Sequence, residues 1–343
     1  MRSVVRIINP YDAGVFPEGD VIFLNSNENP YEPSEDVKRA YIESISRINR
    51  YPDANYPMLK KAISEYLGVE VENLALGCGS SELISRVCDI IVEELDKVAI
   101  PMPSYSLYLT YAMLRDASLL LPVYDRYNIT PEIFEEEKPK LSIICSPNNP
   151  TGNTVERRVA EKIAENSEYV LIDEAYVEFA GRSLIDLVWE FDNVIILRSF
   201  SKFFGLAGLR IGYAIARKEI VEALEKVRLP FAIPTPGVAS AVSAIRSLDY
   251  YLEVRKKIVE ERERVSKELV RLGFEVYPSE ANFILFKADR ELFEELLRQG
   301  IVVRNLNNLI GLEGNFIRMT IGKREENDRV LKLLESKCRD TPT

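Results

Sequence analysis

The chain contains no histidine among its 343 residues. No imidazole is therefore available as a general acid or base, and a lysine, a carboxylate or a tyrosine has to move protons if the protein is an enzyme. Cysteine is also scarce: the chain has only Cys78, Cys88, Cys145 and Cys338, which are widely spaced and form no C-x-x-C pair. This pattern argues against a zinc site, and we predict no bound metal.

Long apolar runs are missing as well. No uninterrupted apolar stretch approaches the roughly 18 residues that indicate a membrane span. Residues 1–6 are not followed by the apolar region of a secretory signal. Together with the scarce cysteine, these features lead us to expect a cytoplasmic protein without a membrane partner. The net charge of −10 argues against a nucleic-acid partner or a general membrane-surface role.

What the sequence does contain is an alternation of short apolar runs with amphipathic helical patterns, between about residues 45 and 230. Such alternation is typical of an α/β domain, in which helices cover both faces of a mostly parallel sheet. The predicted strands are 74–76, 98–100, 119–121, 141–145, 170–172, 194–197 and 211–214.

A smaller α+β domain is expected towards the C-terminus. A long amphipathic helix over 235–272 is predicted to link it to the sheet. Beyond that helix we expect strands at 274–277, 283–286, 301–303 and 316–321, and helices at 289–299 and 325–337. The predicted division is an N-terminal arm (1–45) that joins the small domain, a large domain (46–250) and a small C-terminal domain (251–343).

Lys202 is the first candidate for chemistry. It follows the hydroxyls of Ser199 and Ser201 and precedes Arg210. An amine that attacks a carbonyl forms a Schiff base, and hydroxyls with a guanidinium suit the phosphate of pyridoxal phosphate. A solvated lysine beside a glycine-rich helix start is the alternative, because the motif is short.

Two predicted strands upstream end in polar side chains. Asp173 closes the apolar run 169–172, Tyr176 follows it, and the strand 141–145 leads into a rigid turn with Asn149. The carboxyl ends of strands in an open α/β sheet face the ligand crevice. Asp173 can pair there with the pyridine nitrogen of the same cofactor, and Asn149 and Tyr176 can reach its ring. The alternatives are a helix-capping aspartate and an asparagine that only makes a turn.

A glycine-rich turn, Gly77-x-Gly79-Ser80-Ser81, follows the strand 74–76 and opens an amphipathic helix. Free backbone N–H groups at a helix N-terminus bind anions. Many such turns bind nothing, so this turn indicates an anion site only in combination with the motifs around Lys202 and Asp173.

With these features in this order, the chain resembles the aminotransferases of the histidinol-phosphate aminotransferase family, which are fold-type I pyridoxal-phosphate enzymes. The resemblance covers nearly the whole chain and implies a fold-type I architecture, with a mostly parallel seven-stranded sheet in the large domain, a smaller α+β domain, and pyridoxal 5'-phosphate as cofactor. It rests on motifs at 24–30, 50–53, 77–82, 103–105, 143–152, 169–176, 199–213 and 317–322.

The family pattern implies a role for each matching residue. Lys202 corresponds to the Schiff-base lysine and Asp173 to the partner of the pyridine nitrogen. Asn149 and Tyr176 correspond to partners of the ring oxygen, and Tyr105 to the side chain that stacks on the ring. The implied phosphate partners are Gly79, Ser80, Ser81, Ser199, Ser201 and Arg210.

Tyr51 corresponds to a family tyrosine that reaches the cofactor phosphate of the other subunit. The resemblance therefore implies a homodimer with shared active sites. A tyrosine in a proline-rich turn, with the site complete in one chain, is the alternative.

Three residues are implied to bind the substrate. Arg318 corresponds to the arginine that grips a substrate anion, and Arg304 to a second arginine typical of this family. Tyr11 corresponds to a tyrosine that reaches the substrate phosphate. Two guanidiniums and a phenol suit a phosphate dianion. The alternatives are an Arg304 in an edge-strand ion pair and a Tyr11 packed on the arm.

The expected activity is transamination between L-histidinol phosphate and 2-oxoglutarate, a step of histidine biosynthesis with a small amino donor and a 2-oxo acid as partners. An aromatic-amino-acid aminotransferase and a threonine-phosphate decarboxylase are the alternatives within the fold. A module that only senses the cofactor or a phosphorylated metabolite is the alternative outside catalysis, and no helix-turn-helix or basic extension supports it.

Overall fold

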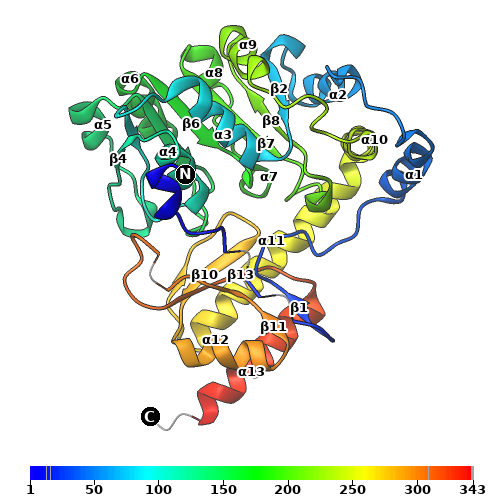
Figure 1. Ribbon diagram of the computed structural model, residues 1–343. Coiled ribbons are helices and arrows are strands. Elements are labelled where there is room, and N and C mark those ends of the chain that lie inside the picture. The colour runs from blue at the N-terminus through cyan, green and yellow to red at the C-terminus, as the bar shows by residue number, and fades with distance from the viewer. Residues whose placement is uncertain (13, 16, 308, 341–343) are drawn as a thin grey trace.

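The computed structural model describes residues 1–12, 14–15, 17–307 and 309–340. The chain forms a large lobe with a broad sheet and a smaller lobe beneath it, and the long helix α11 (Leu248–Arg271) runs from one towards the other (Figure 1). Among the described residues, no helix is long and apolar enough to cross a membrane.

The large lobe contains a seven-stranded sheet, and each strand predicted for it lies within two residues of an observed strand. Only β8 runs antiparallel to its neighbours, so the mostly parallel sheet is confirmed. The strands, in their order across the sheet, are β2 (Leu74–Gly77), β8 (Gly212–Ile215), β7 (Val194–Ser199), β6 (Tyr169–Asp173), β5 (Leu141–Cys145), β3 (Lys97–Ala99) and β4 (Ser118–Leu120).

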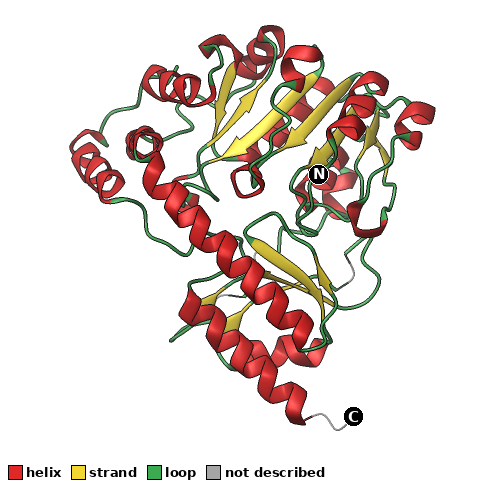
Figure 2. Ribbon diagram, turned by 180° about the vertical axis from the view of Figure 1, so that it is seen from behind, coloured by secondary structure: helices red, strands yellow, loops and turns green. Residues whose placement is uncertain are grey.

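Both faces of this sheet are buried, because successive apolar side chains point to opposite sides of a strand. In β6, Val170 and Ile172 pack in one apolar cluster and Leu171 packs in the other. Figure 2 shows the helices around the sheet from behind. One face is covered by α3 (Ser80–Ile91), α4 (Ser106–Met113) and α9 (Lys218–Lys226), and the other by α6 (Arg157–Asn166) and α8 (Leu187–Glu190).

The small lobe contains a four-stranded antiparallel sheet with helices packed beside it. Its strands in order are β12 (Arg304–Asn305), β13 (Phe316–Thr320), β10 (Phe283–Lys287) and β9 (Val276–Tyr277). The two predicted helices are confirmed as α12 (Arg290–Arg298) and α13 (Arg324–Asp340). A strand of the arm that was not predicted, β1 (Ile22–Phe23), pairs in parallel with β11 (Ile301–Val302).

The prediction of one helix over 235–272 is wrong. Two helices, α10 (Thr235–Arg246) and α11, meet at Ser247, whose φ of −96° and ψ of 29° are not helical. Helix α10 packs its small residues against α1 (Glu35–Ser44) and α2 (Pro57–Leu67) in the large lobe, whereas α11 contacts the short helix α7 (Val177–Ala180) of the large lobe and β9, β10 and α13 of the small lobe. The turn at Ser247 thus separates a helix that packs within the large lobe from one that connects the two lobes.

The helix α1 belongs to the predicted arm but lies beside the large lobe in Figure 1. The domain boundaries at residues 45 and 250 stay predictions. The remaining short helix is α5 (Glu132–Glu137), with 3-10 turns at Ser3–Arg6, Ile45–Arg47, Val71–Asn73, Asp125–Tyr127 and Ala207–Leu209.

Candidate active site

The carboxyl ends of β5, β6 and β7 meet at one edge of the large sheet. Because these strands are parallel neighbours, Cys145 at the end of β5 pairs in register with Asp173 at the end of β6. A cleft of about 600 Å³ opens at this edge. The predicted residues that line it are Tyr11, Ser80, Ser81, Tyr105, Asn149, Asp173, Tyr176, Ser199, Ser201, Lys202, Arg210 and Arg318.

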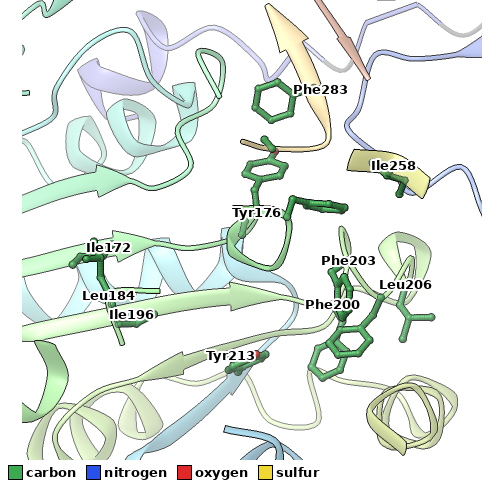
Figure 3. Close-up of a cluster of buried hydrophobic side chains, with 14 of the residues drawn as sticks. Ile172, Tyr176, Leu184, Ile196, Phe200, Phe203, Leu206, Tyr213, Ile258 and Phe283 are labelled. Atoms are coloured by element: carbon green, nitrogen blue, oxygen red, sulfur yellow. The ribbon is translucent and has the colours of Figure 1, made fainter. Parts of the chain in front are cut away.

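Lys202 lies on a short loop after β7 that aromatic side chains hold in place. Phe200, Phe203 and Phe204 are each at most 1% exposed. The rings of Phe200 and Phe204 stack with centroids 4.9 Å apart, and Figure 3 shows Phe200 and Phe203 together in the buried cluster. Such aromatic contacts fix the backbone of the loop, so the lysine leaves the core at a defined point.

The amine of Lys202 is partly buried in the cleft. Its Nζ donates to the main-chain oxygen of Ser26 at 2.8 Å and lies 5.8 Å from the ring centroid of Tyr176. Burial lowers the pKa of Lys202 to about 8, and the positive charge of Arg318 acts in the same direction. The neutral, nucleophilic amine is therefore accessible near physiological pH.

Asp173 is only 3% exposed, and both of its carboxylate oxygens have donors. Tyr108 OH donates to Oδ2 at 2.7 Å, and the N–H of Ala175 donates to Oδ1 at 3.0 Å. Burial raises the pKa of Asp173, while these two hydrogen bonds act to lower it. The carboxylate is thus held in one orientation, facing the cleft.

Tyr108 was not predicted as a site residue, yet it is fully buried and contacts the central carboxylate. It lies three residues after Tyr105 at the start of α4, and the two rings pack edge to face with centroids 5.5 Å apart. Residues three apart share a helix face, so the Tyr105–Tyr108 spacing was the available signal.

Asn149, Tyr176 and Arg318 also line the cleft. Arg318 Nη1 donates to Asn149 Oδ1 at 2.6 Å, and its Nη2 donates to the main-chain oxygen of Asn25 at 2.6 Å. Asn27 Nδ2 donates to Tyr176 OH at 3.0 Å. The Nε of Arg318 is buried and has no acceptor among the described residues, which leaves one donor for a ligand.

The glycine-rich turn faces Arg210. Gly79 has a φ of +79°, which favours glycine, and a Cβ there would lie 2.6 Å from Arg210 Nη2. No described side chain caps the N-terminus of α3. Ser199 Oγ accepts the N–H of Ser201 at 3.0 Å on the neighbouring loop. Backbone N–H groups, hydroxyls and a guanidinium therefore surround one end of the cleft, as an anion site requires.

Arg304 lies outside the main cleft but lines an adjoining cavity of about 510 Å³ together with Tyr11, Tyr105 and Arg318. Arg304 and Arg318 stand directly opposite each other across β12 and β13. The Tyr11 ring packs edge to face on Tyr105, with centroids 6.2 Å apart. Arg304 also makes an edge-strand ion pair with Asp12, as one alternative interpretation expected.

Tyr51 lines neither the main cleft nor the adjoining cavity. Its side chain is 80% exposed and stacks on Phe231 with centroids 4.4 Å apart. It lines a separate cavity with Arg50 and Arg246. Within the described residues, no group of three or more acidic, cysteine or histidine side chains is placed to hold a metal.

The chain is similar to known proteins over most of its length. The family model for aminotransferase class I and II matches residues 19–334. The chain is 56% identical over 340 residues to histidinol-phosphate aminotransferase 2 of Archaeoglobus fulgidus, covering 97% of this chain and 99% of that protein.

Solved structures are similar over most of the chain. The histidinol-phosphate aminotransferase from Clostridium acetobutylicum matches with a TM-score of 0.86 and 28% identity, covering 93% of this chain and 99% of that one. The histidinol-phosphate aminotransferase from Sinorhizobium meliloti, in complex with pyridoxal-5'-phosphate, matches with a TM-score of 0.84 and 26% identity, covering 92% and 90%.

Proposed function

The chain belongs to the family of class I and II aminotransferases, and from that premise we infer that it transfers the amino group of L-histidinol phosphate to 2-oxoglutarate. The products are imidazole acetol phosphate and glutamate, in a step of histidine biosynthesis. The observation that carries this inference is the pair of Arg304 and Arg318, which face each other across two strands and share a cavity with Tyr11. Two guanidiniums and a phenol suit a phosphate dianion.

The cofactor is pyridoxal 5'-phosphate, which supplies an aldehyde that binds amines and a ring that accepts electrons. The residues of the cleft fit this group. The uncapped N-terminus of α3 and the space that Gly79 leaves beside Arg210 suit its phosphate. An amine with a lowered pKa and a buried carboxylate lie in the same cleft.

The proposed phosphate partners of the cofactor come from two loops. Ser80 and Ser81 offer backbone N–H groups at the start of α3, next to Gly79. Ser199 and Ser201 add hydroxyls after β7, and Arg210 adds a guanidinium. Tyr105 is proposed to stack on the ring.

The proposed reacting groups lie at the end of the sheet. Lys202 Nζ would hold the aldehyde of the cofactor, and the same amine, once the amine of the substrate has released it, would move the α-proton, since the chain has no histidine to do so. Asp173 pairs with the ring nitrogen and stabilises its positive charge. Tyr108 orients that carboxylate, and Asn149 and Tyr176 address the ring oxygen.

We also propose that the active unit is a homodimer to which Tyr51 contributes across the interface. Large apolar side chains are exposed close to this tyrosine, as an unpartnered interface requires: Met58 (66%) lines its cavity, Ile48 (63%) precedes it by three residues, and Leu229 (63%) lies two residues before Phe231, on which Tyr51 stacks. Mixing Tyr51→Phe and Lys202→Ala subunits tests the shared site. Heterodimers should regain activity at the one site that has both natural residues, and full activity in a verified monomer would refute sharing.

We propose a cytoplasmic location because the chain contains few cysteines. Cys78, Cys88 and Cys145 are free thiols in the structure, as suits a reducing compartment.

A steady-state panel tests the proposed reaction. The enzyme should transaminate L-histidinol phosphate with a higher kcat/KM than phenylalanine or tyrosine, and should release no carbon dioxide from threonine phosphate. Preference for the aromatic amino acids, or decarboxylation of threonine phosphate, would replace the proposed function with the corresponding alternative.

A further inference from the structure

Arg304 already has a partner on the N-terminal arm. Its Nη2 donates to the main-chain oxygen of Asp12 and lies 3.5 Å from Oδ2 of the same residue. The side chain of Arg304 is 16% exposed, whereas that of Asp12 is 78% exposed. The guanidinium is thus fixed in the wall of the cavity, and the carboxylate reaches it from the solvent side.

A counter-ion is needed at this point because two positive charges stand together. Arg304 and Arg318 are directly opposite across β12 and β13, and like charges in that arrangement destabilise a sheet. Burial lowers the pKa of Arg318, and the charge of Arg304 adds to the lowering. The carboxylate of Asp12 offsets part of this repulsion.

Gly14 helps to position the carboxylate of Asp12. The N–H of Gly14 donates to Asp12 Oδ1 at 2.8 Å. Gly14 has a φ of +84°, and a Cβ there would lie 3.2 Å from Arg304 Nη1. Gly14 therefore packs closely on the guanidinium, and its N–H holds the carboxylate near it.

We infer that Asp12 is the internal counter-ion of Arg304, and that the phosphate of the substrate displaces it. The inference rests on the proposed function, because it requires a phosphate-bearing ligand at Arg304. A competitor within the chain raises the apparent Kd of a ligand, which equals the intrinsic Kd divided by the fraction of sites that the competitor leaves free. Since exposed ion pairs are weak, Asp12 adjusts the affinity for phosphate and does not block the site.

The same contact explains how one cavity serves two substrates in turn. Histidinol phosphate brings a dianion to Arg304, whereas glutamate brings no phosphate. When glutamate occupies the cavity, Asp12 keeps Arg304 paired, so the site is not left with an uncompensated guanidinium.

The substitution Asp12→Asn tests the inference in the enzyme loaded with pyridoxal phosphate. Asparagine keeps the main-chain acceptor for Arg304 and a side-chain oxygen for the N–H of Gly14, so only the charge is removed. The Kd of inorganic phosphate, measured by titration calorimetry, should fall about two- to fivefold. The KM of histidinol phosphate should fall by a similar factor, and the KM of glutamate should not fall.

Asp20→Asn is the matched control. Asp20 lies on the same arm, is 97% exposed, and pairs with Arg329 at 3.5 Å. The substitution Asp20→Asn makes the same change in net charge away from the cavity, so the affinity for phosphate should stay unchanged. An equal fall in the Kd of phosphate in Asp20→Asn would overturn the inference, because the fall in Asp12→Asn would then be an effect of net charge alone.

Unchanged or weaker phosphate binding in Asp12→Asn would also overturn the inference. Arg304→Ala separates this failure from that of the proposed function. If Arg304→Ala weakens phosphate binding while Asp12→Asn fails to strengthen it, only the counter-ion role is wrong. If Arg304→Ala leaves phosphate binding unchanged, both the counter-ion and the proposed phosphate site are wrong.

Discussion

The inner and outer parts of the candidate active site are built differently. The inner part (Lys202, Asp173 and Tyr108) follows the strands of the large sheet or begins a helix packed on it, and Asp173 is 3% exposed. The outer part (Tyr11, Arg304 and Arg318) comes from the arm and the small lobe, and Tyr11 is 55% exposed. The inner part is fixed by the core, whereas the outer part depends on how the arm and the small lobe are placed.

This difference indicates which part of the site determines the rate of reaction and which part determines the choice of substrate. A change in the inner part should lower the rate with every substrate, because it alters the groups that bind the cofactor and move the proton. A change at Tyr11 or Arg304 in the outer part should alter the choice of substrate and leave the cofactor in place, whereas Arg318, which both substrates are proposed to use, should affect both half-reactions.

The largest effect is expected at Lys202. Lys202→Ala removes the amine that is proposed to bind the aldehyde and move the proton, so turnover of every substrate should fall about 10⁴-fold or more. After borohydride treatment, mass spectrometry should find the cofactor attached to the peptide with Lys202 in the natural protein and to no peptide of the variant. Transamination by the variant at a near-natural rate would contradict the assignment of Lys202 as the amine that binds the cofactor.

Asp173→Ala should have the next largest effect. Without the carboxylate the ring nitrogen loses its charge partner, and kcat should fall about 10²- to 10³-fold for phosphorylated and unphosphorylated amines alike. The variant should still bind the cofactor, as its visible absorbance would show. A loss confined to histidinol phosphate would contradict the division into inner and outer parts.

Arg304→Ala changes the outer part of the site and should therefore affect one substrate more than the other. Losing a charge-assisted hydrogen bond costs about 1.5 to 3 kcal/mol, so kcat/KM for histidinol phosphate should fall roughly ten- to a hundredfold. The half-reaction with glutamate should be little changed. Arg318→Ala is the companion variant and should damage both half-reactions, since both substrates use one cavity in turn.

Tyr108→Phe should have a smaller effect. It removes one hydrogen bond to Asp173 while keeping the ring in the core, so kcat should fall about three- to tenfold with little change in KM. Tyr105→Phe, on the same helix face, is the control that keeps the bond to Asp173. Equal losses in the two variants would argue against an orienting role for Tyr108.

The smallest expected effect is a shift in pH dependence. The pKa of Lys202 is lowered to about 8 by burial and by the charge of Arg318. Uptake of cofactor by the apoprotein should therefore become faster as pH rises and level off above that value, because the neutral amine is the nucleophile. In Arg318→Ala the midpoint should move to higher pH, and a midpoint that moves lower would contradict the assigned cause.

The inner part was largely predictable from the sequence and the outer part less so. Apolar runs and the polar residues at their ends are local signals, so the strands were predicted closely and Lys202 and Asp173 line the cleft as expected. The bond between Tyr108 and Asp173 joins residues 65 apart, and the contact between Asp12 and Arg304 spans 292. Periodicity carries no information on such contacts.

Two features of the fold that were not predicted have physical reasons of their own. The strand β1 has only two residues, too few for a pattern. The break at Ser247 went unseen because the amphipathic pattern continues through it, and only the packing of α10 on the large lobe requires the turn.

The most direct test of the central claim compares histidinol phosphate with histidinol as amino donors for the natural enzyme and for Arg304→Ala. The claim that the outer part selects a phosphate predicts a much higher kcat/KM for histidinol phosphate in the natural enzyme, and a ratio that falls roughly ten- to a hundredfold in the variant. Equal kcat/KM values for the two amines in the natural enzyme would contradict it.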